Sequence, residues 1–160
     1  MIFVTVGTHT QQFNRLLEGL DELVGEGKIK EGIFAQTGHS DYRPRSYPYK
    51  NFLTEREYYE KFETCRMVIS HGGAGSIITA LGHKKPLIIA PRLKEFGEHT
   101  NNHQLDLARK LKAGEVCEYV SDVKDLGKII KGYRISYLKR KNIRLLHEIE
   151  GFLREVEHVS

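Results

Sequence analysis

The sequence has few cysteines and no long apolar run. Its two cysteines, Cys65 and Cys117, stand far apart and belong to no Cys-x-x-Cys or Cys/His grouping. This pattern argues against a zinc site and favours a reducing compartment. No apolar stretch approaches the ~18 residues that a membrane-spanning helix needs, and the N-terminus lacks the basic lead-in of a signal peptide. We therefore expect a cytoplasmic protein that is not secreted and does not span a membrane by itself.

Neither sign of charge dominates the chain. Lys and Arg number 25 against 21 Asp and Glu, a formal net charge of +4 at pH 7. This excess is too small to indicate a nucleic-acid partner, and no base-reading motif is present. Residues 127–147, however, hold seven Lys or Arg and no acid. This basic segment could face anionic lipid headgroups or an acidic partner, or it could be a solvated helix face, and both interpretations stay open.

The order of apolar runs and glycine breaks predicts a single α/β domain over residues 1–160. No repeat, low-complexity tract or linker divides the chain. Strands are expected near residues 2–6, 33–37, 51–54, 66–70, 86–91 and 115–120. Helices are expected near residues 13–24, 55–64, 76–81, 104–113 and 122–132, with a helical tail from residue 136, so that the C-terminal segment 122–160 is helical and basic. This alternation predicts a Rossmann-like, doubly wound parallel sheet of about six strands.

The segment His71–Ser76, with the sequence HGGAGS, lies between two aliphatic runs. In a doubly wound sheet, ligands bind where the carboxyl ends of strands lead into helices. Glycines there let the backbone approach a ligand, and a helix N-terminus attracts an anion such as a pyrophosphate, to which Ser76 can donate its hydroxyl. The alternative is a tight turn that Ser76 caps. The spacing fits neither a P-loop nor the G-x-G-x-x-G fingerprint, which leaves a nucleoside diphosphate bound in another way.

Residues 69–91, ISHGGAGSIITALGHKKPLIIAP, followed by EFGEHTNNHQLDLA, resemble the donor-binding half of GT-B glycosyltransferases of family 28. The segments IFVTVGTHTQQFNRLL and PRLKEFGEH narrow the resemblance to stand-alone donor-binding subunits. These include PssE-type polysaccharide transferases and the soluble subunit of the two-subunit dolichol-linked UDP-GlcNAc transferase. The resemblance covers residue 1 to about residue 120. It implies one half of a GT-B fold and a catalytic subunit that transfers a hexose of GlcNAc, GlcA or Gal type from a UDP-sugar to a lipid-linked saccharide.

The same resemblance assigns donor-binding roles to individual residues. The pyrophosphate would be held by Gly7, Thr8, Gly72, Gly73, Ala74, Gly75 and Ser76. Phe52 and Leu53 lie where the family's backbone holds uracil, and Asn102, His103 and Gln104 lie where related enzymes bind sugar hydroxyls. His71 is expected to brace the turn. Thr79 stands where many relatives have a ribose-binding glutamate, and it can offer only a weaker contact. As an alternative to sugar binding, Asn101 or Asn102 would cap the following helix.

The resemblance does not include the acceptor-binding half of a GT-B enzyme, and the expectations about catalysis and partners depend on this. His9, Glu98 and His99 are the local candidates for proton transfer, yet in GT-B enzymes the base usually comes from the acceptor-binding half. The resemblance therefore implies a membrane-anchored, acceptor-binding partner subunit at the cytoplasmic face of the membrane. It implies no metal and no cofactor besides the substrate UDP-sugar. A non-catalytic, nucleotide-sugar-binding enhancer subunit remains the alternative.

Overall fold

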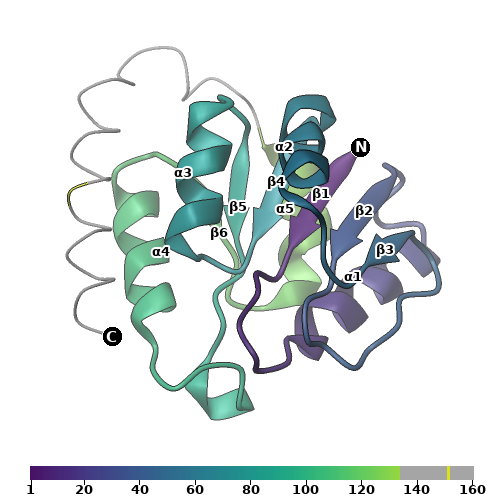
Figure 1. Ribbon diagram of the computed structural model, residues 1–160, viewed down its shortest axis with the longest axis horizontal. Helices are drawn as coiled ribbons and strands as arrows, with labels where there is room; N and C mark the ends of the chain where they lie inside the picture. Colours follow the sequence, from purple (N-terminus) through teal and green to yellow (C-terminus); the bar gives the residue numbers. More distant parts are fainter. Residues whose placement is uncertain (134–150, 152–160) are drawn as a thin grey trace.

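A computed structural model describes residues 1–133 and residue 151 of the chain (Figure 1). The strands are β1 (Ile2–Thr5), β2 (Ile33–Gln36), β3 (Tyr49–Lys50), β4 (Met67–Ser70), β5 (Leu87–Ile89) and β6 (Glu118–Tyr119). The helices are α1 (Asn14–Gly25), α2 (Glu55–Thr64), α3 (Ala74–Gly82), α4 (His103–Ala113) and α5 (Leu126–Gly132), with 3-10 turns η1 (Lys94–Phe96) and η2 (Val123–Asp125). The strands form one parallel sheet in the order β3-β2-β1-β4-β5-β6, which confirms the Rossmann-like prediction.

Helices cover both faces of this sheet. On one face, α1, η2 and α5 pack against inward side chains such as Ile2 and Val4 of β1. On the other face, α2, α3 and α4 pack against side chains such as Phe3 of the same strand. Because each strand is buried on both faces, β1, β4 and β5 are apolar almost throughout rather than alternating. The result is the three-layer arrangement seen in Figure 1.

The strand order places a topological switch point between β1 and β4. From β1 the chain crosses through α1 to β2 on one side, whereas from β4 it crosses through α3 to β5 on the other. The loops after β1 and β4 therefore diverge at the carboxyl ends of these two strands, the place where open α/β sheets commonly have a crevice. In open α/β sheets this crevice is where ligands bind. The expected donor loops, at residues 7–8 and 72–76, both begin here.

The third strand lies upstream of its predicted place at residues 51–54. Its position is set by β2, because the N–H of Ala35 donates to the carbonyl of Pro48 at 3.1 Å and the N–H of Thr37 donates to that of Lys50 at 2.9 Å. Thr54 instead begins α2, where it forms a reciprocal capping box with Glu57. The prediction for this strand was therefore wrong by a few residues.

Other predicted boundaries hold with small shifts. The helix predicted at residues 76–81 starts earlier, at Ala74. Asp122 caps the segment before α5, where its carboxylate accepts from the N–H of Lys124 at 3.0 Å. The predicted tail from residue 136 and most of the basic segment 127–147 lie outside the described residues. Among the residues that are described, none belongs to a helix long and apolar enough to cross a membrane.

Candidate functional site

The His71 imidazole is wedged between the two loops at the switch point. A Cβ placed on Gly7 would lie 2.6 Å from its Cε1 atom, and a Cβ placed on Gly73 would lie 2.3 Å from its Nε2 atom. Its Nδ1 atom lies 3.3 Å from the carbonyl oxygen of Thr5. Burial, reinforced by nearby Arg92, lowers the pKa of His71 to about 3, so the ring is neutral and Nδ1 donates to this carbonyl. His71 braces the turn, as predicted.

Two serine hydroxyls hold the turn from inside. The N–H of Gly72 donates to Oγ of Ser70 at 3.1 Å, and the two hydroxyls of Ser70 and Ser76 lie 2.6 Å apart. Oγ of Ser76 in turn donates to the carbonyl of Gly73 at 2.8 Å. Ser76 is buried and its hydroxyl hydrogen is used within the turn. Donation of this hydroxyl to a ligand, which we expected, is therefore not supported by the structure.

The N-terminus of α3 presents free backbone donors. The N-cap residue Gly73 makes no side-chain cap bond, and the first N–H that bonds back to it, at 3.1 Å, belongs to Ile77. Within the described part of the chain, the N–H groups of Ala74, Gly75 and Ser76 have no hydrogen-bond partner. A Cβ on Gly75 would meet no atom within 4 Å, so this side of the helix start is open. Unpaired amides and the helix dipole together form an anion-binding surface.

Thr79 lies one turn further along α3. Its hydroxyl donates to the carbonyl of Gly75 at 2.7 Å. The hydrogen is thus used within the helix, and the oxygen can serve a ligand only as an acceptor. This geometry agrees with the expectation that Thr79 offers less than the glutamate of many relatives.

The start of α4 lies against the glycine turn. A Cβ on Gly72 would come within 3.5 Å of Cβ of Gln104, whose side-chain oxygen accepts from the N–H of Arg92 at 3.2 Å. The amide nitrogen of Gln104 has no hydrogen-bond partner in the described ranges and remains for a ligand. Asn101 bonds the start of the helix, accepting from the N–H of His103 at 3.0 Å.

Asn102 occupies the N-cap position of α4, but its side chain does not bond the helix. Its side-chain oxygen accepts from the N–H of Lys94 at 2.9 Å instead. Of the two predicted capping asparagines, Asn101 is therefore the one whose side chain satisfies a helix N–H. Asn102 and His103 are both exposed.

The residues expected at uracil follow β3. Phe52 is 46% exposed and Leu53 is half-buried. The Phe52 ring stands edge-on to that of His39, with centroids 5.0 Å apart. A Cβ on the neighbouring Gly38 would lie 2.7 Å from the carbonyl oxygen of Gly7, so the loops after β1 and β2 touch. An exposed aromatic ring thus lies near the first-strand loop that includes Thr8.

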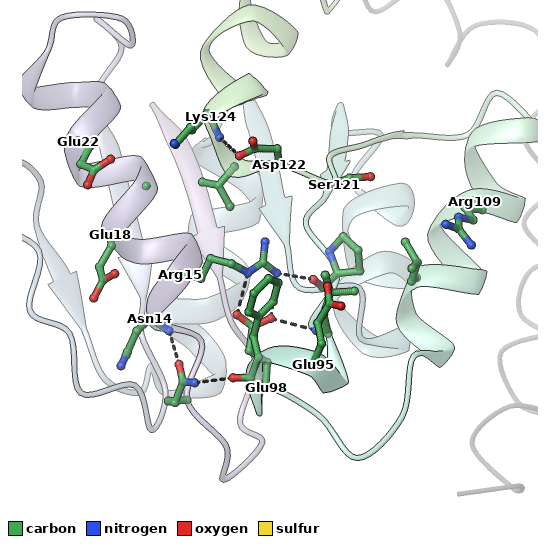
Figure 2. A pocket seen from close by; sticks show the side chains of 17 residues that line it. Asn14, Arg15, Glu18, Glu22, Glu95, Glu98, Arg109, Ser121, Asp122 and Lys124 are labelled. Carbon is green, nitrogen blue, oxygen red and sulfur yellow. Dashed lines mark hydrogen bonds and ion pairs between the residues drawn. The ribbon is translucent and has the colours of Figure 1, made fainter.

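Glu98 does not have the place expected of a catalytic base. Arg15 of α1 binds its carboxylate in a bidentate pair, in which Nε donates to Oε1 and Nη2 donates to Oε2, both at 2.9 Å (Figure 2). The N–H of Leu93 also donates to Oε2 at 2.9 Å, and the carboxylate side chain is 1% exposed. A buried carboxylate with both oxygens bonded holds the β5–α4 segment and has no access to a substrate. The prediction that Glu98 transfers protons was therefore wrong.

Arg92 ties together the segments that follow β1 and β5. Its side chain is fully buried, and Nη2 donates to the carbonyl of Val6 at 2.7 Å. Nη1 donates to the carbonyls of Gln11, Gln12 and Glu98 at 2.8, 3.0 and 3.1 Å. Burial lowers the pKa of Arg92 to about 10, so it stays charged at neutral pH. Sequence reasoning missed both Arg15 and Arg92; the available signal was an arginine directly after a buried apolar strand.

The structure brings His9 and His99 together from these two segments. Their ring centroids lie 5.0 Å apart and their planes are inclined by 32°. Nδ1 of His9 accepts from the N–H of Gln11, and Nδ1 of His99 accepts from the N–H of Asn101, each at 3.3 Å. Burial, followed by nearby His9, lowers the pKa of His99. Both histidines therefore lie at the same end of the sheet as the glycine turn.

A cavity of about 860 Å³ lies between α1 and α4, and Arg15 and Glu98 are among the residues that line it (Figure 2). Leu93, Phe96 and Leu105 contribute apolar side chains to its wall. None of the expected donor-binding residues lines it. This cavity is thus separate from the glycine turn, and the β5–α4 segment contributes to both places.

Known proteins share this fold and part of this sequence. SnogD of Streptomyces nogalater, a glycosyltransferase, superposes with a TM-score of 0.62 at 18% identity, covering 93% of this chain and 39% of its own. The calicheamicin glycosyltransferase CalG4 superposes with a TM-score of 0.61 at 11% identity, covering 97% of this chain and 43% of its own. At such low identity the likeness concerns the fold alone.

Two sequence relatives are more similar over a shorter region. The human UDP-N-acetylglucosamine transferase subunit ALG13 is 31% identical over 119 residues, 69% of this chain. The mouse protein of the same name is 29% identical over 116 residues, 68% of this chain. The chain aligns with only 10% of the length of either relative. The family model of the glycosyltransferase family 28 C-terminal domain matches residues 1–142, and the chain therefore belongs to this family.

Proposed function

We propose that this chain is the donor-binding catalytic subunit of a glycosyltransferase that uses a UDP-sugar. The observation that carries the proposal is that, among the described residues, three N–H groups at the open start of α3 have no hydrogen-bond partner, those of Ala74, Gly75 and Ser76. They lie at the switch point of the sheet, where an anionic ligand is expected. Family membership and relatives named as UDP-N-acetylglucosamine transferase subunits support a nucleotide-sugar as that ligand.

The surrounding residues suit the other parts of such a donor. The pyrophosphate would lie on the α3 amides, approached from the β1 side by Gly7 and Thr8. The uracil would lie toward Phe52 and Leu53. The sugar would lie toward the β5–α4 segment, where Gln104 keeps an amide hydrogen-bond donor for a hydroxyl. As the bond to the sugar breaks, charge grows on the diphosphate, and preorganised N–H groups stabilise such charge most effectively.

We further propose that a membrane-associated partner completes the site and brings a lipid-linked saccharide acceptor. The chain corresponds to 39% of SnogD and 43% of CalG4, about one half of a GT-B enzyme. An inverting transfer needs a base for the acceptor hydroxyl, and Glu98 is held by Arg15 instead. A base from the partner fits this arrangement. The transferred sugar would be a hexose of GlcNAc, GlcA or Gal type, and the complex would lie at the cytoplasmic face of the membrane.

The alternative is an enhancer subunit that binds a nucleotide-sugar without forming the catalytic site. Gly75→Asp separates the two, because its carboxylate would lie at the pyrophosphate position in otherwise open space. Gly82→Asp is the matched control, since Gly82 also has open space and lies at the opposite end of α3. The protein and each variant are added to membranes of the producing cell with sugar-labelled UDP-sugars, and label in the lipid extract is counted.

A catalytic subunit predicts that Gly75→Asp abolishes transfer and that Gly82→Asp leaves it near the wild-type level. Transfer with Gly75→Asp that falls only to the level of membranes without added protein, where that level is clearly above zero, would favour the enhancer alternative. Equal transfer by both variants would contradict the proposed donor site.

A further inference from the structure

Basic side chains gather beside the glycine turn. His9 comes from the segment after β1, and His99 comes from the segment after β5. Burial, followed by nearby His9, Arg92 and His103, lowers the pKa of His99. The acid on the same segment, Glu98, already has both oxygens bonded to Arg15. The side chains that lower the pKa of His99 are thus all basic, and no carboxylate is among them.

The histidine pair and the glycine turn share one site. His71 touches the positions of Gly7 and Gly73, and besides burial and Arg92 the nearby His99 and His9 also lower its pKa. The pair is thus within electrostatic reach of the loop whose amides face the open surface. An anion on those amides would also interact with the two imidazoles.

The neighbours of His99 disfavour its charged form. Two imidazoles at 5.0 Å, next to buried Arg92, oppose each other's protonation. A pyrophosphate brings two negative charges, which offset the repulsion and favour the charged rings. Anion binding and proton uptake are therefore coupled in this geometry, and by linkage each strengthens the other.

We propose that His9 and His99 take up protons from solvent when the donor binds, and that the charged pair then holds the pyrophosphate and stabilises the departing UDP. In this step each ring gains an N–H bond at Nδ1 while an O–H bond of the solvent breaks, and the solvent recovers the protons when UDP leaves. The inference rests on the proposed function, since the ligand is the pyrophosphate of the same donor. His9 and His99 thereby act on the departing UDP, whereas the base for the acceptor hydroxyl comes from another residue.

A purely structural role is the competing explanation. Each Nδ1 accepts a backbone N–H, and protonation of Nδ1 would break that bond. At 3.3 Å these bonds are long and weak, so a nearby dianion outweighs them. If instead the rings only shape their turns, they remain neutral in the complex.

Histidine NMR of the full chain distinguishes these cases. Ring signals are titrated from pH 5.5 to pH 8.5 without UDP and with saturating UDP, with His9→Gln and His99→Gln serving for assignment. We expect the midpoints of His9 and His99 to move to higher pH by about one unit, which corresponds to about tenfold tighter binding to the charged form. His83, at the far end of α3, is the internal control and should not respond.

Unchanged or lower midpoints in the UDP complex would overturn the inference and leave the donor site intact. Absence of any UDP binding would instead overturn the donor site itself. The double variant His9→Gln/His99→Gln adds a functional readout: its affinity for UDP should fall at least about tenfold at pH 6 and much less at pH 8.5. A loss of equal size at both pH values would mark a structural role and contradict the proposal.

Discussion

The Nε2 atom of His71 lies 2.3 Å from the point where a Cβ on Gly73 would stand. No side chain fits at residue 73 while the imidazole keeps its place between the loops after β1 and β4. Because the neutral ring also bonds the carbonyl of Thr5, it fixes the path of the backbone into α3. The open amides at the start of α3 are thus positioned by a buried side chain.

Gly73→Ala should destabilise the protein by about 1 to 3 kcal/mol, the usual cost of overpacking a filled interior. Gly75→Ala is the matched change two residues on, where a Cβ meets no atom within 4 Å. It should leave stability unchanged or raise it by up to about 1 kcal/mol, since alanine favours a helix. Urea unfolding of both variants checks the pair. Equal effects would show that His71 does not limit residue 73.

Stability should fall in mild acid because of His71. Its pKa in the folded protein is about 3, against 6.5 for the free side chain, so below pH 6.5 the unfolded chain binds the proton and the folded chain does not. The stabilisation is present above pH 6.5 and is lost as pH falls toward 3. Between pH 7.5 and pH 5.5 the loss from this residue is about 1.4 kcal/mol.

The test compares the wild type with His71→Gln. The variant should be less stable at pH 7.5, but its unfolding free energy should decline less between pH 7.5 and pH 5.5. Urea unfolding at several pH values gives this difference in slope. Parallel declines in the two proteins would mean that the imidazole is already charged in the folded state.

The Arg15–Glu98 pair should behave as a buried ion pair. Arg15→Met leaves the Glu98 carboxylate, whose side chain is 1% exposed, buried without its charged partner. It should lower the free energy of unfolding by about 3 to 5 kcal/mol. Glu98→Gln should cost less, because the Arg15 side chain is 23% exposed and can reach water. Denaturant unfolding of the single variants and of the double variant gives their coupling energy. Additive effects, within about 0.5 kcal/mol, would contradict the pair's role.

Much of the fold could be predicted from local patterns. The strands β1, β4 and β5 are continuous apolar runs between glycines, prolines or polar residues, and α2 has the predicted range 55–64 because Thr54 and Glu57 signal its start. The two-residue strand β3 could not be placed in this way. Its position depends on the ladder to β2 and not on its own residues.

The candidate site could be predicted only in part. The glycine turn, its place at a strand end and the bracing role of His71 followed from residue types and their order. The burial of charged side chains could not be predicted, because Glu98 and Arg15 are 83 residues apart and meet only in the folded chain. By its residue type alone Glu98 is a catalytic candidate, and the sequence does not show that His9 and His99 meet.

Calorimetric titration with UDP tests the donor site most directly, because UDP is common to all UDP-sugar donors. It is applied to the wild type, to Gly75→Asp, which places a carboxylate among the open amides of α3, and to Gly82→Asp at the helix's other end. We predict that the wild type and Gly82→Asp bind UDP alike and that Gly75→Asp does not bind it. Absence of binding to the wild type at millimolar UDP, or undiminished binding to Gly75→Asp, would contradict the donor site.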